Sequence, residues 1–196
     1  DPRGQSLDAY AHLSVRFSPG ADVALFNAIL NVIISEELYD TAYIAEHTEG
    51  FEALKTHTVD MTPEAMSGLC GVEPETIREV ARLYANAERA MIFWGMGISQ
   101  HTHGTDNARC LISLALACGQ TGRPGTGLHP LRGQNNVQGA SDAGVIPMVM
   151  PDYQPVNDDQ VRAAFEELWN TKLDPTPGLT VVEIMDAITA GTIRGM

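Results

Sequence analysis

The chain has 196 residues, of which 44% are hydrophobic and 19% charged, and it carries a formal net charge of −13. This composition is ordinary for a globular protein with one good core, or one core and part of another. The acidic balance argues against nucleic acid and against an anionic membrane surface as partners. No apolar run reaches the roughly 18 residues needed to span a bilayer, and no signal peptide is visible at the amino terminus.

The first elements predicted are a short strand and a long helix. Residues 13–17 alternate apolar and polar side chains, which predicts a strand, and residues 18–20 are a Ser-Pro-Gly turn signal. A helix is predicted over residues 22–37, with a carboxylate in its first turn, where the helix dipole favours it. Apolar residues cover most of this helix and leave a narrow stripe at Asn27 and Asn31. This pattern predicts that the helix is largely buried against a sheet.

The middle of the chain is predicted to be helical around one buried strand. Residues 39–70 are expected to form short helices, and a clearer helix begins at residues 73–75, where proline suits the first helical position. Residues 90–94 form a continuous apolar run, which is typical of a strand buried on both faces of a parallel sheet. Another helix is predicted over residues 106–118, with Gly119 placed to end it.

The last third of the chain is less regular. Residues 120–155 are rich in glycine and proline and have little periodicity, and a long irregular stretch of this kind usually indicates function. Helices are predicted at about 158–170 and 180–190, and a strand near Thr192. The alternation of strands and helices predicts an α/β fold with a mainly parallel sheet.

The most distinctive loop runs from His129 to Gly139 and contains Arg132 among several side-chain amides. Arginine offers a fixed fork of N–H donors, and amides offer both donors and acceptors. The loop is therefore a candidate binding site for a polar, anionic ligand, since binding residues concentrate on loops. A plain polar surface loop is an equal alternative from the composition alone.

A second candidate is the turn Gly95 to Gln100, which follows the predicted strand. Small residues at the carboxyl end of a strand allow the backbone to approach a phosphate or a ring. Gln100 stands where a dinucleotide fingerprint has its third glycine, so the turn is a weak nicotinamide-cofactor signal. The alternative is a tight strand-to-helix turn with Met96 in the core, which the residues alone favour.

The cysteines and histidines give no metal site. Cys70, Cys110 and Cys118 fit no zinc or iron–sulfur spacing and are predicted to be buried structural thiols. This odd, sparse count suits a reducing cytoplasm. His101 and His103 lack a surrounding ligand pattern and are predicted to be surface side chains.

Taken together, these motifs resemble the active-site region of molybdenum-dependent formate dehydrogenases. These enzymes are bis-molybdopterin-guanine-dinucleotide oxidoreductases, a family that includes the dimethyl sulfoxide and nitrate reductases. The resemblance covers essentially the whole chain, and residues 100–109 are most similar to the cytoplasmic, NAD-linked formate dehydrogenases. The segments that carry it are Asp1–Arg3, Phe17–Asp22, Trp94–Gln100, Gly122–Gly127, Arg132–Gly139 and Ala140–Gly144.

The resemblance implies a set of site residues. Arg132 is implied as the catalytic arginine that orients formate beside molybdenum. The alternative is a purely structural role, in which Arg132 forms a local ion pair with Asp142. The implied cofactor-binding residues are Asp1, Pro2, Arg3, Gly20, Ala21, Asp22, Met96, Gln100 and Gln134. The first three would lie near the guanosine end, and Gly20 to Asp22 would contact guanine, although Asp22 also suits a helix start.

The resemblance also implies an organisation. Residues 1–140 would be part of a molybdopterin-guanine-dinucleotide-binding domain, Rossmann-like and three-layered, with an incomplete, mainly parallel sheet. Residues 141–196 would begin the adjacent cofactor-binding α/β domain. The implied cofactors are bis-molybdopterin guanine dinucleotide with molybdenum, and an iron–sulfur cluster outside this chain. The implied partners are formate and electron-transfer subunits that are flavin/NAD-linked or contain iron–sulfur clusters. The resemblance implies no nucleic-acid partner, no membrane insertion and a cytoplasmic location.

One departure from the family limits the expected activity. The family's molybdenum ligand is cysteine or selenocysteine followed by histidine, and this chain has no Cys-His pair and no cluster motif. We therefore expect a fragment of a larger catalytic subunit, inactive by itself. The alternatives are a related oxidoreductase for a substrate such as nitrate, a non-catalytic nucleotide-binding or interaction module, and an ordinary NAD-binding domain.

Overall fold

The structure is a computed structural model that describes residues 1–195 and divides into two compact units, Asp1–Gly133 and Gln134–Met196. The first unit contains η1 (Ser6–Ala9), α1 (Asp22–Ser35), α2 (Thr41–His47), α3 (Phe51–Thr58), α4 (Pro63–Cys70), α5 (Pro74–Ala85), β1 (Met91–Trp94), α6 (Met96–Ser99), α7 (Gly104–Ala117) and β2 (Gly127–Pro130). The second contains α8 (Val137–Asp142), β3 (Val149–Met150), η2 (Pro151–Tyr153), β4 (Gln154–Pro155), α9 (Asp159–Trp169) and α10 (Val181–Thr189). None of the helices within residues 1–195 is long and apolar enough to cross a membrane.

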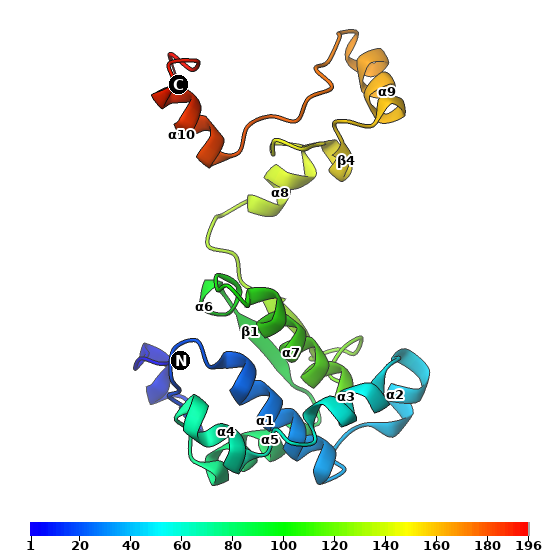
Figure 1. Ribbon diagram of the computed structural model, residues 1–196. Helices are drawn as coiled ribbons and strands as arrows, with labels where there is room; N and C mark the ends of the chain where they lie inside the picture. The colour runs from blue at the N-terminus through cyan, green and yellow to red at the C-terminus, as the bar shows by residue number, and fades with distance from the viewer. Residues whose placement is uncertain (196) are drawn as a thin grey trace. The chain divides into compact units, whose positions relative to one another are not determined.

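Helix α1 is the centre of the first unit and confirms the predicted helix (Figure 1). The expectation that a sheet would bury it is wrong, because helices α3, α4, α5 and α7 surround it. Its two asparagines are buried and not on an exposed stripe. Asn31 donates from Nδ2 to the carbonyl oxygens of Thr58 (2.9 Å) and Val59 (3.2 Å), and Cys110 Sγ lies 3.7 Å from Asn27 Oδ1. Hydrogen bonding lets these amides enter the core.

The parallel sheet of the first unit consists of β1 and β2, which confirms the mixed α/β class. Met91 pairs with Gly127 and Trp94 with Pro130, and helix α7 lies between the two strands in sequence. In the second unit, β3 and β4 pair antiparallel.

Two predicted strands do not form. Residues 13–17 have no regular secondary structure; Val15 and Phe17 pack on the core, but no ladder partner lies beside them within residues 1–195. The amino group of Asp1 donates to Val15 O (3.1 Å) instead. Near Thr192 the chain turns, because the N–H groups of Thr192 and Ile193 donate back to Ala187 O at the end of α10.

Strand β1 is covered on one face, so its predicted burial on both faces is wrong within the described residues. Ile92 and Trp94 pack against the core, whereas Met91 and Phe93 remain 45% and 58% exposed. The register places His129 of β2 beside Phe93. We call Met91, Phe93 and His129 the outer face of the sheet.

The predicted start of α5 and the buried thiols are confirmed, and α4 has a side-chain cap. Thr62 accepts a hydrogen bond from Ala65 N (3.2 Å) at the start of α4, and Pro74 opens α5. All three cysteines are buried, and burial raises the pKa of Cys110 to about 11 and that of Cys118 to about 12. The thiols of Cys110 and Cys118 are therefore protonated and unreactive at neutral pH.

Gln120 joins the loop after α7 to the segment before β1. The side chain is 2% exposed; its Nε2 donates to Ala87 O (2.8 Å), and its Oε1 accepts from Ala90 N (3.0 Å) and Arg123 Nη2 (3.2 Å). Replacing Gln120 with methionine is expected to lower the free energy of unfolding by about 2 kcal/mol, because buried backbone groups lose their partners. Urea unfolding followed by circular dichroism measures this change. An unchanged urea midpoint would contradict it.

Candidate functional site

The carboxyl ends of β1 and β2 lie at the same edge of the parallel sheet. Strand β1 leads into Gly95 and α6, and β2 leads into Leu131 and Arg132. The pairing continues past β2, since Leu131 N donates to Trp94 O (2.6 Å). Ligands of open α/β sheets bind outside the carboxyl ends of the strands. The two motifs singled out in the sequence therefore meet at the edge where such a fold binds ligands.

The turn from Gly95 to Gln100 is open. A Cβ added to Gly97 would meet no atom within 4 Å, and one added to Gly95 would only reach Leu131 O at 3.7 Å. Met96 is 51% exposed and Gln100 is exposed, so Met96 is not part of the core. The structure thus leaves backbone and side chains of this turn accessible to a ligand.

Arg132 is exposed, and its guanidinium has no ion pair and no hydrogen bond within residues 1–195. An arginine held by a nearby carboxylate would have its donors occupied. The Arg132 side chain is therefore available to bind an anion. The position of this side chain is set by the backbone at the end of β2.

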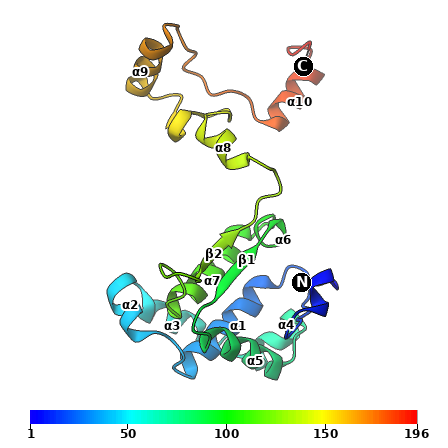
Figure 2. The same ribbon diagram turned by 180° about the vertical axis from the view of Figure 1, so that it is seen from behind.

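The start of α1 lies at the same end of the first unit as α6, as Figures 1 and 2 show from opposite sides. Gly20 has φ +83°, a conformation that favours glycine, and Ala21 N donates to Ser18 O (3.1 Å). Asp22, 3% exposed, is the first residue of α1. The predicted guanine-contacting turn therefore lies toward the same end as the Gly95–Gln100 turn.

The remaining predicted residues are more peripheral. Asp1, Pro2 and Arg3 are exposed, and Arg3 N donates to Asp1 Oδ1 (2.8 Å). Gln134 is exposed and belongs to the second unit. Within the first unit, the structure brings Met96 and Gln100 to the edge where Arg132 follows β2.

Residues that hold α6 in place were not identified from the sequence. Asn107 is 3% exposed and donates from Nδ2 to Ile98 O (2.9 Å). The exposed His101, predicted as a surface histidine, places Nε2 2.6 Å from Gly97 O. A Cβ on Gly104 would overlap the carbonyl oxygen of Ser99. A polar residue on the apolar side of a predicted helix, as Asn107 is, was the available signal.

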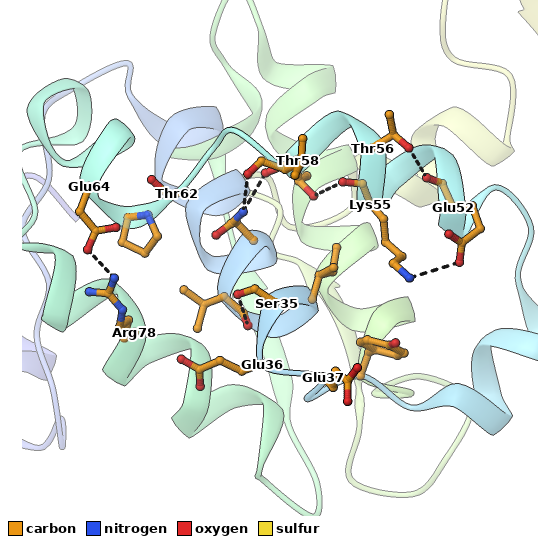
Figure 3. Close-up of a pocket in the computed structure, with 16 residues that line it drawn as sticks. Ser35, Glu36, Glu37, Glu52, Lys55, Thr56, Thr58, Thr62, Glu64 and Arg78 are labelled. Atoms are coloured by element: carbon orange, nitrogen blue, oxygen red, sulfur yellow. Dashed lines mark hydrogen bonds and ion pairs between the residues drawn. The ribbon is translucent and has the colours of Figure 1, made fainter.

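A large cleft of the first unit lies elsewhere. It has a volume of about 780 Å³ and is lined by the end of α1, by α3 and by residues of α4 and α5 (Figure 3). Four of its charged side chains form two ion pairs, Lys55 with Glu52 and Arg78 with Glu64. This cleft lies at the end of α1 that is far from Asp22, so the size of a cavity does not identify the predicted site.

One lining carboxylate gives a pH-dependent prediction. Arg82 donates two hydrogen bonds of 2.8 Å to Glu36, and these bonds and the charge of the guanidinium hold the pKa of Glu36 below its ordinary 4.5. A lowered folded-state pKa stabilises the fold above pH 4.5, and this contribution is lost as the pH falls below that value. Glu36→Gln is therefore expected to be less stable than the parent at pH 7, with a smaller difference at pH 3.5. Urea midpoints at both pH values measure it, and an equal difference at both would refute it.

The comparisons with known proteins assign the chain to a family. The family model described as molybdopterin oxidoreductase matches residues 1–196. The chain belongs to the molybdopterin oxidoreductase family. It is 48% identical over 186 residues to the F420-dependent formate dehydrogenase subunit alpha of Methanocaldococcus jannaschii, covering 95% of this chain and 27% of that protein. It is 40% identical over 195 residues to formate dehydrogenase H of Escherichia coli, covering 99% of this chain and 27% of that protein.

A solved family relative shares the fold. The acetylene hydratase of Pelobacter acetylenicus matches with a TM-score of 0.62 and 26% identity, over 64% of this chain and 17% of that chain. This molybdopterin oxidoreductase chain spans about a quarter of the length of the curated relatives above. Its fold is thus shared by proteins whose names describe different reactions, so the substrate has to be argued from the site.

Proposed function

We propose that this chain is a section of the catalytic subunit of a formate dehydrogenase, which oxidises formate to carbon dioxide. The observation that carries the proposal is the accessible, unpaired Arg132 at the carboxyl edge of β1 and β2, next to the open Gly95–Gln100 turn. The formate dehydrogenase relatives, at 40% and 48% identity, support the same substrate.

The residues at this edge fit the family's cofactor, bis-molybdopterin guanine dinucleotide. The open space where Gly95 and Gly97 lack a Cβ accommodates phosphates and flat rings at close approach. We assign cofactor contacts to Asp1, Pro2, Arg3, Gly20, Ala21, Asp22, Met96, Gln100 and Gln134. When bound, the cofactor supplies molybdenum as the two-electron acceptor.

The chain's own contribution is binding and orientation. Formate is a small carboxylate, and Arg132 donates two parallel N–H hydrogen bonds to its two oxygens. The guanidinium also neutralises the substrate's negative charge, which lowers the cost of taking formate out of water. Formate then leaves as carbon dioxide with the loss of two electrons and one proton. Gln134 steadies the edge of the cofactor through its amide.

The same proposal covers organisation and partners. Residues 1–140 belong to a Rossmann-like, three-layered cofactor-binding domain with a mainly parallel sheet, and residues 141–196 begin the neighbouring cofactor-binding domain. Electrons leave through iron–sulfur clusters held by other parts of the polypeptide, to flavin/NAD-linked or iron–sulfur subunits, in the cytoplasm. The relative of M. jannaschii is itself named as an alpha subunit, which supports a multi-subunit assembly.

The activity of the isolated chain tests this proposal. The 196-residue chain, incubated with the cofactor, is expected to show no formate oxidation, because it contains no Cys-His pair to bind molybdenum. The full catalytic subunit that includes it is expected to reduce a viologen dye with formate. Dye reduction by the isolated chain would contradict the first expectation. A full subunit that reduces nitrate and does not oxidise formate would overturn the assignment of substrate.

A further inference from the structure

The outer face of the sheet holds an aromatic stack beside the proposed substrate arginine. The rings of Phe93 and His129 lie 4.9 Å apart, with an angle of 19° between their planes. The two residues are direct neighbours in the parallel register of β1 and β2. Gly127 leaves room for this arrangement, because a Cβ there would lie 3.1 Å from His129 Nε2. The histidine ring therefore covers a position of β2 that has no side chain.

The environment of Nε2 argues against a role of this ring nitrogen as ligand or proton carrier. Nε2 of His129 is buried and has no hydrogen-bond partner within residues 1–195. A histidine that transfers a proton or binds a metal needs a ring nitrogen within hydrogen-bond or coordination distance of its target. Nε2 is enclosed and meets neither requirement. What the ring offers at this position is its flat face, which stacks on Phe93.

The stack lies just before Arg132 in the chain. His129 is the third residue of β2, and after β2 ends the hydrogen bond from Leu131 N to Trp94 O keeps the chain against β1. Since no side chain within residues 1–195 holds the guanidinium, its position follows the backbone of this segment. A contact on the outer face that holds β2 against β1 therefore also fixes the position of the Arg132 backbone.

We propose that His129 is a positioning residue, whose stack on Phe93 holds the end of β2 in register and thereby places Arg132 for formate. The inference rests on the proposed role of Arg132 in binding formate. It assigns to the imidazole a packing role that a carbon ring could perform, because no hydrogen bond of Nε2 would be lost. His129→Phe should therefore keep the function that His129→Ala loses.

The test uses steady-state kinetics of the full, cofactor-loaded catalytic subunit with formate as the varied substrate. His129→Ala is expected to raise KM for formate about tenfold while kcat per molybdenum stays within about twofold, because binding of the carboxylate weakens in ground and transition states alike. His129→Phe is expected to keep KM within about twofold of the parent. A defect in folding or cofactor loading would instead lower the active fraction and leave KM unchanged.

Phe93 provides a second, independent variant. Its side chain is 58% exposed in this chain and lies outside the core of the first unit, so Phe93→Ala leaves that core intact; it is expected to raise KM for formate in the same way as His129→Ala. The double variant should be no worse than either single one, because both remove the same stack. Additive effects of the two substitutions would overturn the proposal, and so would an equal rise in KM for His129→Phe and His129→Ala.

The control separates this inference from the proposed function. If Arg132→Ala leaves formate oxidation unchanged, the role of Arg132 is wrong, and the role of His129 fails with it. If Arg132→Ala abolishes activity while His129→Ala and Phe93→Ala keep the parent KM, only the positioning role of the stack is wrong.

Discussion

Arg132→Ala is expected to lower kcat/KM for formate about 10³-fold in the full catalytic subunit. Two charge-assisted hydrogen bonds to one carboxylate are worth about 4 kcal/mol together, and each 1.4 kcal/mol is a factor of ten. Arg132→Lys keeps the charge but loses the paired donors, so it is expected to cost about thirtyfold. Dye-linked formate oxidation, normalised to bound molybdenum, measures both variants.

A matched arginine controls for the general loss of positive charge. Arg89 is exposed and lies just before β1, at the opposite end of the strand pair from Arg132. Arg89→Ala is expected to change kcat/KM by less than about twofold, because a charge at that distance is screened at physiological salt. Equal losses for Arg89→Ala and Arg132→Ala would show that the effect is not specific to the sheet edge.

Gly104→Ala is expected to destabilise the first unit by about 3 kcal/mol. The added Cβ would overlap the backbone oxygen of Ser99, and a backbone carbonyl cannot rotate away as a side chain can. The helices α6 and α7 would have to separate, which also breaks the hydrogen bond from Asn107 to Ile98 O. Urea unfolding of the chain, followed by circular dichroism, measures the loss.

The same substitution elsewhere has the opposite expected sign. Gly68 lies within α4, and a Cβ there would meet no atom within 4 Å. Gly68→Ala is therefore expected to stabilise the chain by about 0.5–1 kcal/mol, because alanine loses less backbone entropy than glycine in a helix. If Gly104→Ala also stabilises the chain, then α6 does not approach α7 as closely as the structure has it.

The helices were predictable from the sequence because their signals are local. The carboxylate at Asp22, the proline at Pro74 and the apolar period of residues 106–118 each lie within a few residues of the helix that they indicate. The parallel pairing of β1 could also be anticipated, since a continuous apolar run is typical of such strands. Local chemistry was therefore sufficient for most of the helical framework.

Features that depend on distant partners were not predictable. The alternation of residues 13–17 is present in their burial, yet a strand also needs a partner, and a sequence pattern does not supply one. The burial of Asn31 depends on carbonyl groups at Thr58 and Val59, more than 25 residues away. The open outer face of β1 likewise follows from what covers it, which an apolar run cannot report.

At the candidate site, the sequence predicted the candidate binding residues but not the residues that hold them in position. Arg132 and the Gly95–Gln100 turn were found because their chemistry and spacing resemble a known active-site region. Gly104 and His129 act through contacts with Ser99 and Phe93, and neither contact leaves a mark in the sequence. The assignment of roles to the cofactor-binding residues stays a prediction until the variants are measured.

The pairing of β1 with β2 has a consequence for the order of folding. Residues 95–126 separate the two strands, so this edge forms only after a long loop has closed. Loop closure costs entropy that local helices do not pay, and long-range pairings accordingly form late. Helices α4 and α5, which follow one another in the chain, can pack together without closing such a loop. The binding edge therefore cannot exist before residues 95–126 have folded back, and a cofactor can dock there only after β1 and β2 have paired.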